Sequence, residues 1–360
     1  MNKHMKFLLV LLSIVFLFVS CINDSDNSTP DGPVIEGTWP FWESAAVAGW
    51  STEKLEQARA HFSLMDSAAV VVVYQGKVLC AWGDYRGGYL THSVRKSFMS
   101  AVYGIYVDRG QLDLNKTMEE LGIDDVPPLT RDEKQAMVIH LLQARSGVYH
   151  TAAAETQSMH DYKPERGTYA PGEFWCYNNW DFNALATIFD QETDSDFFTA
   201  LNEDLLQKLG AEDYIPQING YSYQLDRSIH PAYGFRISAR DCARFGLLFL
   251  QNGKWGDEQI ISPEWVAEST AMVSDAGDYF PGTYYGYMWW IYPQGYGAEW
   301  GLLYSSRFRT YAALGAYGQV IAVIPDAELV FVHRVNSYQG DDVPLSDITV
   351  LLDKILAARY

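Results

Sequence analysis

The chain has 360 residues, of which 48% are hydrophobic and 14% aromatic, a composition typical of a packed globular protein and not of a fibre or a disordered chain. Its 45 acidic and 26 basic side chains leave a formal net charge of −19. Because phosphate binding requires a basic face, this acidic excess argues against a nucleic-acid-binding function.

The first twenty residues have the layout of a secretory signal peptide. Two lysines precede an uncharged apolar run over residues 7–19, which is too short to span a membrane as a helix. The run ends at Phe18-Val19-Ser20-Cys21, which resembles the lipobox of bacterial lipoproteins, although Leu17 stands one place earlier than the usual leucine. The resemblance implies that residues 1–20 are removed, that Cys21 carries the lipid, and that the protein is anchored in the bacterial cell envelope, on its periplasmic or surface face.

The segment after the signal is predicted to be a disordered tether over residues 21–37, because Asp, Asn, Ser and Pro dominate it. Residues 38–360 are long enough for one large domain. Cys80, Cys176 and Cys242 are widely spaced and cannot all pair within one chain, so no disulfide framework is expected. There is no Cys-x-x-Cys and no His-Glu-x-x-His, so neither a metal site nor a cofactor is predicted.

Two hairpin patterns lie near the ends of this domain. Residues 68–74 and 77–82 are apolar runs around a tight turn, and residues 319–324 and 329–335 repeat the pattern close to the C-terminus. A last amphipathic helix is predicted from Ser346 onwards. The simplest architecture is an α/β fold with a sheet made from both chain ends and flanked by helices.

The sequence between the two hairpins is mainly helical. Thr130-Arg131-Asp132-Glu133 has the form of a capping box before a helix over residues 137–144. Residues 240–250 and the stretch Ser262-Pro263-Glu264-Trp265 mark further helices. We therefore expect a mainly helical region, about residues 97–229, inserted between the α/β parts at about 38–92 and 230–360.

The stretch Thr91-His92-Ser93-Val94-Arg95-Lys96-Ser97-Phe98 opens a run that is apolar on nearly every face and ends at Gly110. It is predicted to deliver Ser93 to the first turn of a buried helix. Residues three apart share a helix face, so the Lys96 ammonium can reach the Ser93 hydroxyl. A desolvated lysine has a lowered pKa and can act as a base. Ser93 and Lys96 are therefore a candidate nucleophile and base.

The same spacing occurs at Ser51-Thr52-Glu53-Lys54, and about one such match per chain is expected by chance. There, Ser51 is better interpreted as the N-cap of an amphipathic helix that continues through Leu55 and Ala58. The Ser93 pair therefore needs support from other motifs.

That support comes from Pro171-Gly172-Glu173-Phe174-Trp175-Cys176-Tyr177-Asn178-Asn179, about eighty residues after Ser93. Tyr177 and Asn179 resemble the Tyr-x-Asn motif of serine hydrolases related to class C β-lactamases and penicillin-binding proteins. The resemblance implies that Tyr177 shuttles a proton to the leaving group and that the Asn179 amide helps to hold the lysine and the substrate carbonyl. We also expect a tyrosine beside an ammonium to ionise below its free pKa near 10.

The family's third motif is a strand with the pattern Lys or His, any residue, Gly. The stretch 311–319 has Gly315 in the glycine position but Ala313 in the cation position. This departure is closer in pattern to the branch of 6-aminohexanoate-dimer hydrolase and related esterases. The resemblance covers most of residues 45–355 and implies a β-lactamase-like, DD-peptidase type of fold. By the same analogy, the backbone N–H groups of Ser93 and Ala316 would bind the oxyanion.

Several other residues have two interpretations. The aromatic run Tyr284, Tyr285, Tyr287, Trp289 and Trp290 can wall an acyl pocket, but a core strand is favoured. His150 follows a Ser-Gly turn and is more typical of a solvated or structurally bonded histidine. Cys176 has no basic neighbour in sequence, so a buried inert thiol is favoured over a nucleophile.

The leading hypothesis is an exported, lipid-anchored serine hydrolase that cleaves a small ester or amide through an acyl-enzyme. A β-lactamase or D-Ala-D-Ala peptidase is the alternative within the same chemistry, and Ala313 counts against it. A catalytically inactive homologue that senses a ligand is the alternative from another class, and the intact Ser93, Lys96 and Tyr177 count against it. The expected partners are a small-molecule substrate and, through Cys21, a membrane, with no nucleic acid and no metal.

Overall fold

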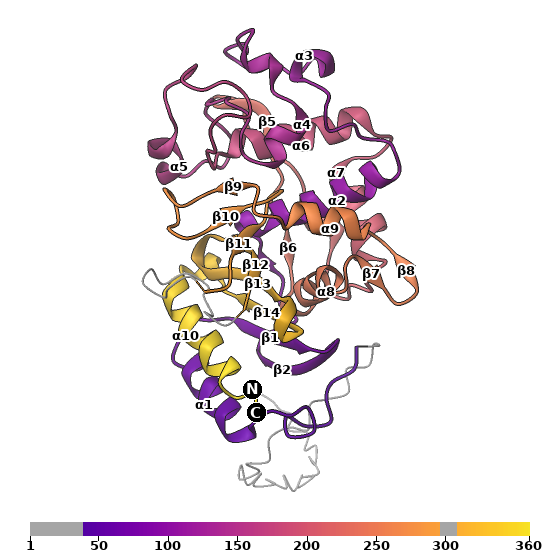
Figure 1. The fold of residues 1–360 in the computed structure, drawn as a ribbon, viewed down its shortest axis with the longest axis vertical. Coiled ribbons are helices and arrows are strands. Elements are labelled where there is room, and N and C mark those ends of the chain that lie inside the picture. Colours follow the sequence, from indigo (N-terminus) through magenta and orange to yellow (C-terminus); the bar gives the residue numbers. More distant parts are fainter. Residues whose placement is uncertain (1–38, 296–307) are drawn as a thin grey trace, which may run out of the picture.

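The computed structural model describes residues 39–295 and 308–360. The predicted signal peptide, the tether and Cys21 lie outside the described residues. The α/β fold expected from the sequence is confirmed: one large antiparallel sheet is flanked by helices, and a mainly helical region lies beside it (Figure 1).

The sheet has eight strands in the order β2-β1-β14-β13-β12-β11-β10-β9, so strands from both chain ends lie side by side in it. The two predicted hairpins are present as β1–β2 and β13–β14, and β1 pairs with β14 from Ala69↔Arg334 to Tyr74↔Leu329. The strands are β1 (Ala69–Tyr74), β2 (Lys77–Gly83), β9 (Ser274–Asp275), β10 (Tyr284–Tyr285), β11 (Trp290–Tyr292), β12 (Thr310–Gly315), β13 (Gln319–Ile324) and β14 (Leu329–Arg334). Every residue of β1, β13 and β14 is buried, as their unbroken apolar sequences require.

Helices cover the central strands. Helix α8 (Ala239–Leu250) packs on β1, β13 and β14, and α1 (Thr52–Phe62) packs against α10 (Leu345–Leu356). The approach of α8 is close: a Cβ at Gly246 would stand 2.5 Å from Val330 Cγ1, so only glycine fits there. In α1, Ser51 is the N-cap and accepts a hydrogen bond from the Lys54 N–H, so the structural interpretation of that serine is confirmed.

The remaining elements form the helical region and its connections, including three two-stranded ladders: β3 with β6, β4 with β5, and β7 with β8. Helix α2 is almost entirely buried and lies between the sheet and the helical region (Figure 1). These elements are β3 (Tyr89–Leu90), α2 (Arg95–Asp108), α3 (Met118–Leu121), α4 (Val138–Leu142), α5 (Gln157–Tyr162), α6 (Asn179–Glu192), α7 (Phe197–Ala200), β4 (Ser222–Gln224), β5 (Ser228–Ala232), β6 (Arg236–Ile237), β7 (Lys254–Trp255), β8 (Glu258–Gln259) and α9 (Pro263–Ser269).

Two helix predictions differ in outcome. Ser262 is the N-cap of α9, as its Ser-Pro-Glu-Trp sequence indicated. The reciprocal bonds of the predicted capping box are also formed: the Thr130 N–H donates to Glu133 Oε2 over 2.7 Å, and the Glu133 N–H to Thr130 Oγ1 over 3.2 Å. They close only a short 3₁₀ turn (Glu133–Gln135), and α4 begins separately at Val138. The assignment of this box to the next helix was wrong, because the extended Ala136 interrupts the chain between them.

Candidate active site

Ser93 lies in a 3₁₀ turn (His92–Val94) that leads directly into α2. The strand before it, β3, pairs with β6, and Thr91 continues this pairing: its N–H and its hydroxyl both donate to the Phe235 carbonyl over 2.9 Å. Ser93 therefore stands on a short turn that is fixed on one side by a strand and on the other by a buried helix.

Lys96 reaches both other members of the predicted set. Its Nζ lies 2.9 Å from Ser93 Oγ and 2.7 Å from Tyr177 Oη, and its side chain is buried. No carboxylate of the described residues lies within ion-pair distance of it. Burial, together with the neighbouring Arg95 guanidinium, holds the pKa of Lys96 well below its usual range. A neutral amine beside a serine hydroxyl can accept that proton.

Tyr177 lies in an aromatic enclosure. Its ring centroid is 5.2 Å from those of Trp290 and Phe182 and 5.8 Å from that of Tyr285. Burial raises the pKa of Tyr177 well above its ordinary value, outweighing the opposite effect of the hydrogen bond with Ser93. The expectation of easier ionisation was therefore wrong, because the aromatic enclosure buries the Tyr177 hydroxyl and desolvation opposes its charged form. Tyr177 keeps its proton at neutral pH and is suited to donate it.

Gly315 ends β12 beside the nucleophile. A Cβ at this position would stand 2.6 Å from the Thr91 carbonyl oxygen and 3.1 Å from the Ser93 nitrogen, so a side chain would separate the strand from Ser93. Ala316 follows immediately and is exposed. The predicted pair of amides, at Ser93 and Ala316, is thus on two segments that are in contact.

Asn179, the first residue of α6, is buried. Its Nδ2 donates to the Ala154 carbonyl over 2.7 Å and to the Ala153 carbonyl over 3.4 Å, not to a substrate-facing group. Its Oδ1 is buried and has no hydrogen-bond partner among the described residues. The two bonds of Lys96 go to Ser93 and Tyr177, so Asn179 makes no direct bond to the lysine here.

The cation position of the third motif is filled by a buried alanine. Ala313 pairs with Ile321 in the sheet and is 1% exposed. Arg309, four residues upstream, does not supply a cation here: it donates to the Thr270 carbonyl over 2.6 Å and lines a cleft away from Ser93.

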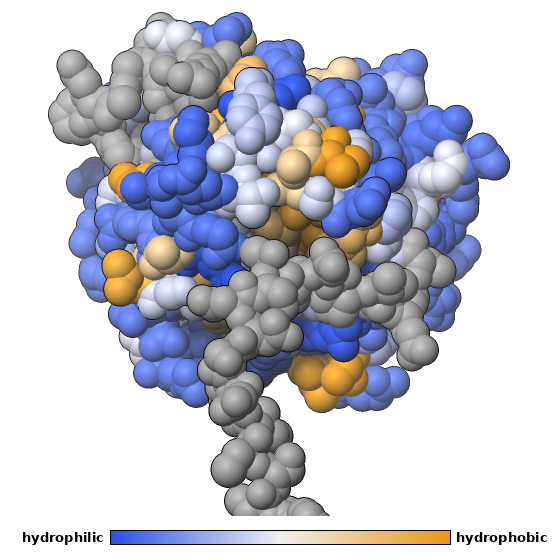
Figure 2. Space-filling view, turned by 90° about the horizontal axis from the view of Figure 1, so that it is seen from below, coloured by the Kyte–Doolittle hydropathy of each residue, from blue (hydrophilic) through white to orange (hydrophobic). Residues whose placement is uncertain are grey.

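Two clefts of the described structure lie away from Ser93. One of about 580 Å³ is lined by residues of α8, α9 and the β13–β14 turn, and one of about 640 Å³ lies between α1 and β2. Seen from below, the surface is mostly hydrophilic, with apolar residues gathered in a hollow (Figure 2).

Within the described ranges, no group of three or more His, Cys, Asp or Glu side chains is arranged to hold a metal ion. No helix there is long and apolar enough to cross a membrane.

Comparison with known proteins identifies the family of this chain. The β-lactamase family model matches residues 54–353, which is most of the chain. The chain belongs to the β-lactamase family. Members of this family, which includes esterase, amidase and penicillin-binding-protein-like enzymes, are generally serine hydrolases. No curated protein sequence matches the chain.

Solved structures of the β-lactamase family share its fold. A 6-aminohexanoate-dimer hydrolase homologue from Bacillus anthracis is 19% identical, with a TM-score of 0.59 over 83% of this chain and 80% of that one. A β-lactamase homologue from Bacteroides dorei DSM 17855 is 17% identical, with a TM-score of 0.61 over 85% of this chain and 98% of that one. A penicillin-binding protein from Bacillus halodurans is 15% identical, with a TM-score of 0.60 over 82% of this chain and 99% of that one. At these identities the likeness shows the fold alone.

The aromatic run at residues 284–290 and the Cys176 thiol have the structural roles that the sequence favoured. Tyr285, Tyr287, Trp289 and Trp290 are buried in the core, although Tyr285 and Trp290 also enclose Tyr177. Burial raises the pKa of the Cys176 thiol to about 12, so it is protonated and unreactive at neutral pH.

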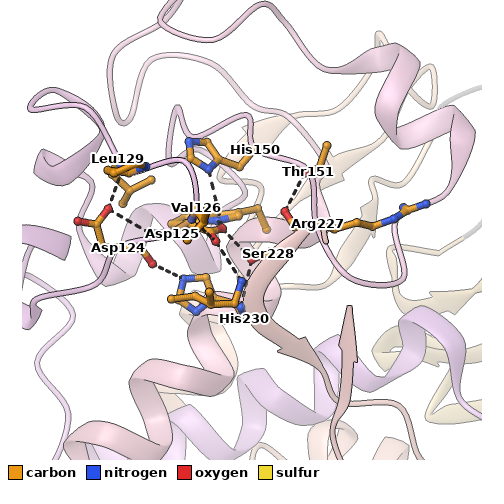
Figure 3. Close-up of polar contacts among 12 residues, drawn as sticks. Asp124, Asp125, Val126, Leu129, His150, Thr151, Arg227, Ser228 and His230 are labelled. Atoms are coloured by element: carbon orange, nitrogen blue, oxygen red, sulfur yellow. Dashed lines mark hydrogen bonds and ion pairs between the residues drawn. The ribbon is translucent and has the colours of Figure 1, made fainter. Parts of the chain in front are cut away.

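His150 belongs to a buried polar cluster in the helical region (Figure 3). Its two ring nitrogens each lie 3.8 Å from a carboxylate oxygen, one of Asp125 and one of Glu133. Asp125 also accepts hydrogen bonds of 2.7 Å from Ser228 Oγ and Trp180 Nε1. Burial opposes protonation of His150, but the two carboxylates outweigh it and raise its pKa. This cluster joins segments of the helical region and is a structural feature.

Sequence reasoning missed one charged neighbour of the site. Arg95 is 5% exposed and has no carboxylate of the described residues within ion-pair distance. Its guanidinium lies 4.7 Å from the centroid of the Tyr233 ring, 3.3 Å from Asn183 Oδ1 and 3.4 Å from the His92 carbonyl oxygen. The signal was visible in the sequence as a second basic residue directly before the candidate base.

Proposed function

We propose that this member of the β-lactamase family cleaves a small ester or amide through an acyl-enzyme on Ser93, with Lys96 as general base and Tyr177 as proton donor. The observation that carries the proposal is the position of Lys96 Nζ, within hydrogen-bond distance of both Ser93 Oγ and Tyr177 Oη in a buried setting. A neutral amine and a protonated phenol are the forms that these two roles need.

Acylation begins when Ser93 Oγ attacks the substrate carbonyl carbon and Lys96 Nζ takes the hydroxyl proton. The carbonyl oxygen becomes an oxyanion that accepts hydrogen bonds from the Ser93 and Ala316 N–H groups. As the bond to the leaving group breaks, Tyr177 donates its proton to the departing oxygen or nitrogen and regains one from the Lys96 ammonium. The step thus ends with an ester at Ser93, a free alcohol or amine, and Lys96 neutral again.

Deacylation repeats the sequence with water. Tyr177 and Lys96 together take one proton from the attacking water, the oxyanion forms in the same amide pair, and Ser93 Oγ leaves with its proton restored. No separate carboxylate base is assigned to this step, because Lys96 and Tyr177 lie directly at the nucleophile.

The proposed substrate class rests on Ala313. In relatives, a cation at this strand position binds the carboxylate of a β-lactam or a D-alanyl terminus. A buried alanine offers no such contact, and Arg309 is directed to the Thr270 carbonyl. We therefore favour short-chain esters and simple amides over penicillins and cephalosporins.

The nucleophile is tested by labelling with a fluorophosphonate probe and mapping of the modified peptide. Ser93→Ala should abolish both labelling and turnover of nitrophenyl acetate, whereas Ser51→Ala, which removes a helix cap with the same Ser-x-x-Lys spacing, should retain both. Retained labelling of the Ser93→Ala protein sinks the assignment. A wild-type protein that binds ligands but shows neither labelling nor turnover would favour the sensor alternative.

The substrate class is tested by comparing nitrocefin with nitrophenyl esters on one preparation. Clear ester turnover with weak nitrocefin cleavage supports the ester or amide assignment. A kcat/KM for nitrocefin within about tenfold of the diffusion ceiling of 10⁸ M⁻¹s⁻¹ would restore the β-lactamase alternative.

The cellular location remains part of the same proposal. Lipidation at Cys21 would hold the enzyme at the cell envelope, since a multiply acylated N-terminus binds membranes stably. Expressed in a bacterium that processes lipoproteins, the wild-type protein should incorporate labelled fatty acid and the Cys21→Ser variant should not. A mature wild-type N-terminus other than residue 21 overturns this part alone.

A further inference from the structure

Two residues beside the nucleophile adopt a backbone conformation that side chains disfavour. His92 has φ of +46° and Tyr317 has φ of +66°, both in the left-handed region that glycine fills most easily. His92 immediately precedes Ser93, and Tyr317 immediately follows Ala316. The disfavoured positions therefore flank the two amides that are proposed to bind the oxyanion.

The two side chains contact each other. The ring centroids of His92 and Tyr317 are 4.9 Å apart with planes inclined at 54°. On its other side, His92 Nε2 lies 2.8 Å from Ser337 Oγ, in the segment that follows β14. The backbone at Gly315 approaches the same turn closely, since a Cβ added there would stand 3.1 Å from the Ser93 nitrogen. Three segments that are distant in sequence thus meet at the edge of the site.

A costly backbone conformation persists only where the surroundings hold it in place. Here the ring contact joins the two residues, and Ser337 holds the His92 ring from its other side. An aromatic pair contributes free energy beyond its buried area, and it does so only while both backbone segments keep their present geometry. The contact therefore couples the conformation of the turn before Ser93 to that of the turn after Gly315.

His92 is unsuited to act as an acid or base in the reaction. Its ring bonds to Ser337 and packs on Tyr317, and the distances to Ser93 Oγ that define the site belong to Lys96. Burial, with the charges of Arg334 and Arg95, lowers the pKa of His92 to about 4. The ring is therefore neutral at any pH where the enzyme would work, and the contact does not change with pH in that range.

We propose that His92 and Tyr317 form an aromatic clamp that holds the Ser93 and Ala316 amides at the spacing an oxyanion requires. Both are positioning residues: they act through the backbone of their neighbours and do not touch the substrate's reacting atoms. This inference rests on the proposed function, because it assigns a role in the same acyl transfer.

A double-mutant cycle on kcat tests the clamp. Asparagine tolerates the left-handed region, so His92→Asn and Tyr317→Asn remove the ring contact and leave the backbone conformation accessible. Each single variant should lower kcat for nitrophenyl acetate by about tenfold with KM little changed, a smaller loss than removal of an oxyanion donor. The double variant should be no worse than the poorer single variant, because the contact is already lost. Tyr317→Phe, which keeps the ring, should retain wild-type kcat.

Inhibition by phenylboronic acid gives a second readout, since one hydroxyl of its serine adduct occupies the oxyanion position. Its inhibition constant should rise about as much as kcat falls in both asparagine variants. Tyr338→Asn is the matched control: Tyr338 is 64% exposed, lies next to Ser337 and stacks on Arg236 instead of on His92. It should leave both quantities unchanged. Tyr317 is itself 45% exposed, so its substitution should not unfold the protein, and melting temperatures verify this.

The outcomes separate the clamp from the proposed function. Additive losses in the double variant, or single variants with unchanged kcat and boronate inhibition, overturn the clamp while Ser93-dependent turnover leaves the hydrolase intact. A rise in KM with kcat unchanged also overturns it, because a role in substrate binding would then replace the positioning role. Absence of Ser93-dependent turnover and labelling in the wild-type protein refutes the hydrolase itself, and the clamp falls with it.

Discussion

Lys96 and His150 are both buried basic side chains of the inner molecule, but their surroundings differ in one respect. His150 stands between the carboxylates of Asp125 and Glu133, whereas Lys96 stands beside Arg95 with no carboxylate of the described residues in ion-pair distance. The pKa of His150 is accordingly raised and that of Lys96 lowered. Burial disfavours the charged form at both positions. At Lys96 the Arg95 charge adds to this effect, whereas at His150 the two carboxylates outweigh it.

This difference in surroundings matches the structural role of His150 and the proposed role of Lys96 as a general base. In the polar cluster around His150 (Figure 3), the Asp125 and Glu133 carboxylates each face one ring nitrogen at 3.8 Å, and protonation of His150 gives both of them a cation as a partner. Lys96 has no carboxylate of the described residues within ion-pair distance, so nothing there offsets the lowering of its pKa by burial and by Arg95. Under the proposed function this lowered pKa suits Lys96 to accept a proton, and adding or removing charges near it tests that role.

The largest effect is expected from removal of the base. Lys96→Ala should lower kcat/KM for nitrophenyl acetate by about 10²–10⁴-fold, the usual contribution of a positioned proton acceptor. The matched control is Lys163→Met, which removes a buried lysine that does have a partner, Glu155 Oε1 at 2.5 Å. Stopped-flow measurement of acylation should show a large loss only at Lys96. Equal losses at both lysines would mean that burial, not the missing partner, matters.

A smaller, substrate-dependent effect is expected at Tyr177. Tyr177→Phe removes the donated proton but keeps the ring in its aromatic enclosure. Because a poor leaving group needs the proton more, hydrolysis of amides should fall by about 10²-fold or more, and hydrolysis of nitrophenyl esters clearly less. Steady-state rates for an anilide and an ester of the same acid measure the ratio. An equal loss for both substrates excludes Tyr177 as donor to the leaving group.

These predictions rest on features that local sequence patterns could supply. The Ser93–Lys96 distance follows from helical spacing, and β1, β13 and β14 follow from short apolar runs around turns. The Tyr177 position came from the resemblance, because nothing local ties residue 177 to residue 93. The raised pKa of Tyr177 was missed, since it depends on aromatic neighbours from several segments.

Other features had no sequence signal that could have been used. The His150 cluster joins Asp125, Glu133 and Ser228, whose pairing is set only by the tertiary fold. The left-handed conformation of His92 was equally hidden, because histidine at such a position gives no sign of it. The predicted cap at residues 130–133 failed for a related reason: its local bonds form, but the chain beyond them extends.

A moderate effect is expected from giving Arg95 the partner that it lacks. Asn183→Asp places a carboxylate where Asn183 Oδ1 now lies 3.3 Å from the guanidinium. The new carboxylate would offset the positive charge of Arg95, so the pKa of Lys96 should rise towards its usual value. Activity requires neutral Lys96, so the acidic limb of the kcat/KM profile should move to higher pH, by about one unit.

Asn183→Ala removes the same contact without adding charge and serves as the control. Its acidic limb should stay within a few tenths of a pH unit of the wild-type limb. If Asn183→Asp also leaves the limb in place, Arg95 does not tune Lys96. If both variants move it equally, the amide contact and not the charge is responsible.

At His150 we expect no change in activity, and an effect on stability alone. A raised pKa means that the folded protein binds the proton more tightly than the unfolded chain does. The stabilisation is therefore fully present below about pH 6.5, the unfolded value, and is lost as the pH rises through the raised folded value. His150→Gln cannot titrate, so it should lower the free energy of unfolding by about 1–3 kcal/mol at pH 6 and by less at pH 9. Urea unfolding at the two pH values measures this difference.

The titratable groups that face His150 from the other elements are Asp125, Glu133, Arg166 and His230, and none of them touches Ser93. The kcat of folded His150→Gln protein should therefore equal that of the wild type, and a kcat that changes with His150 would show that the cluster and the site are coupled.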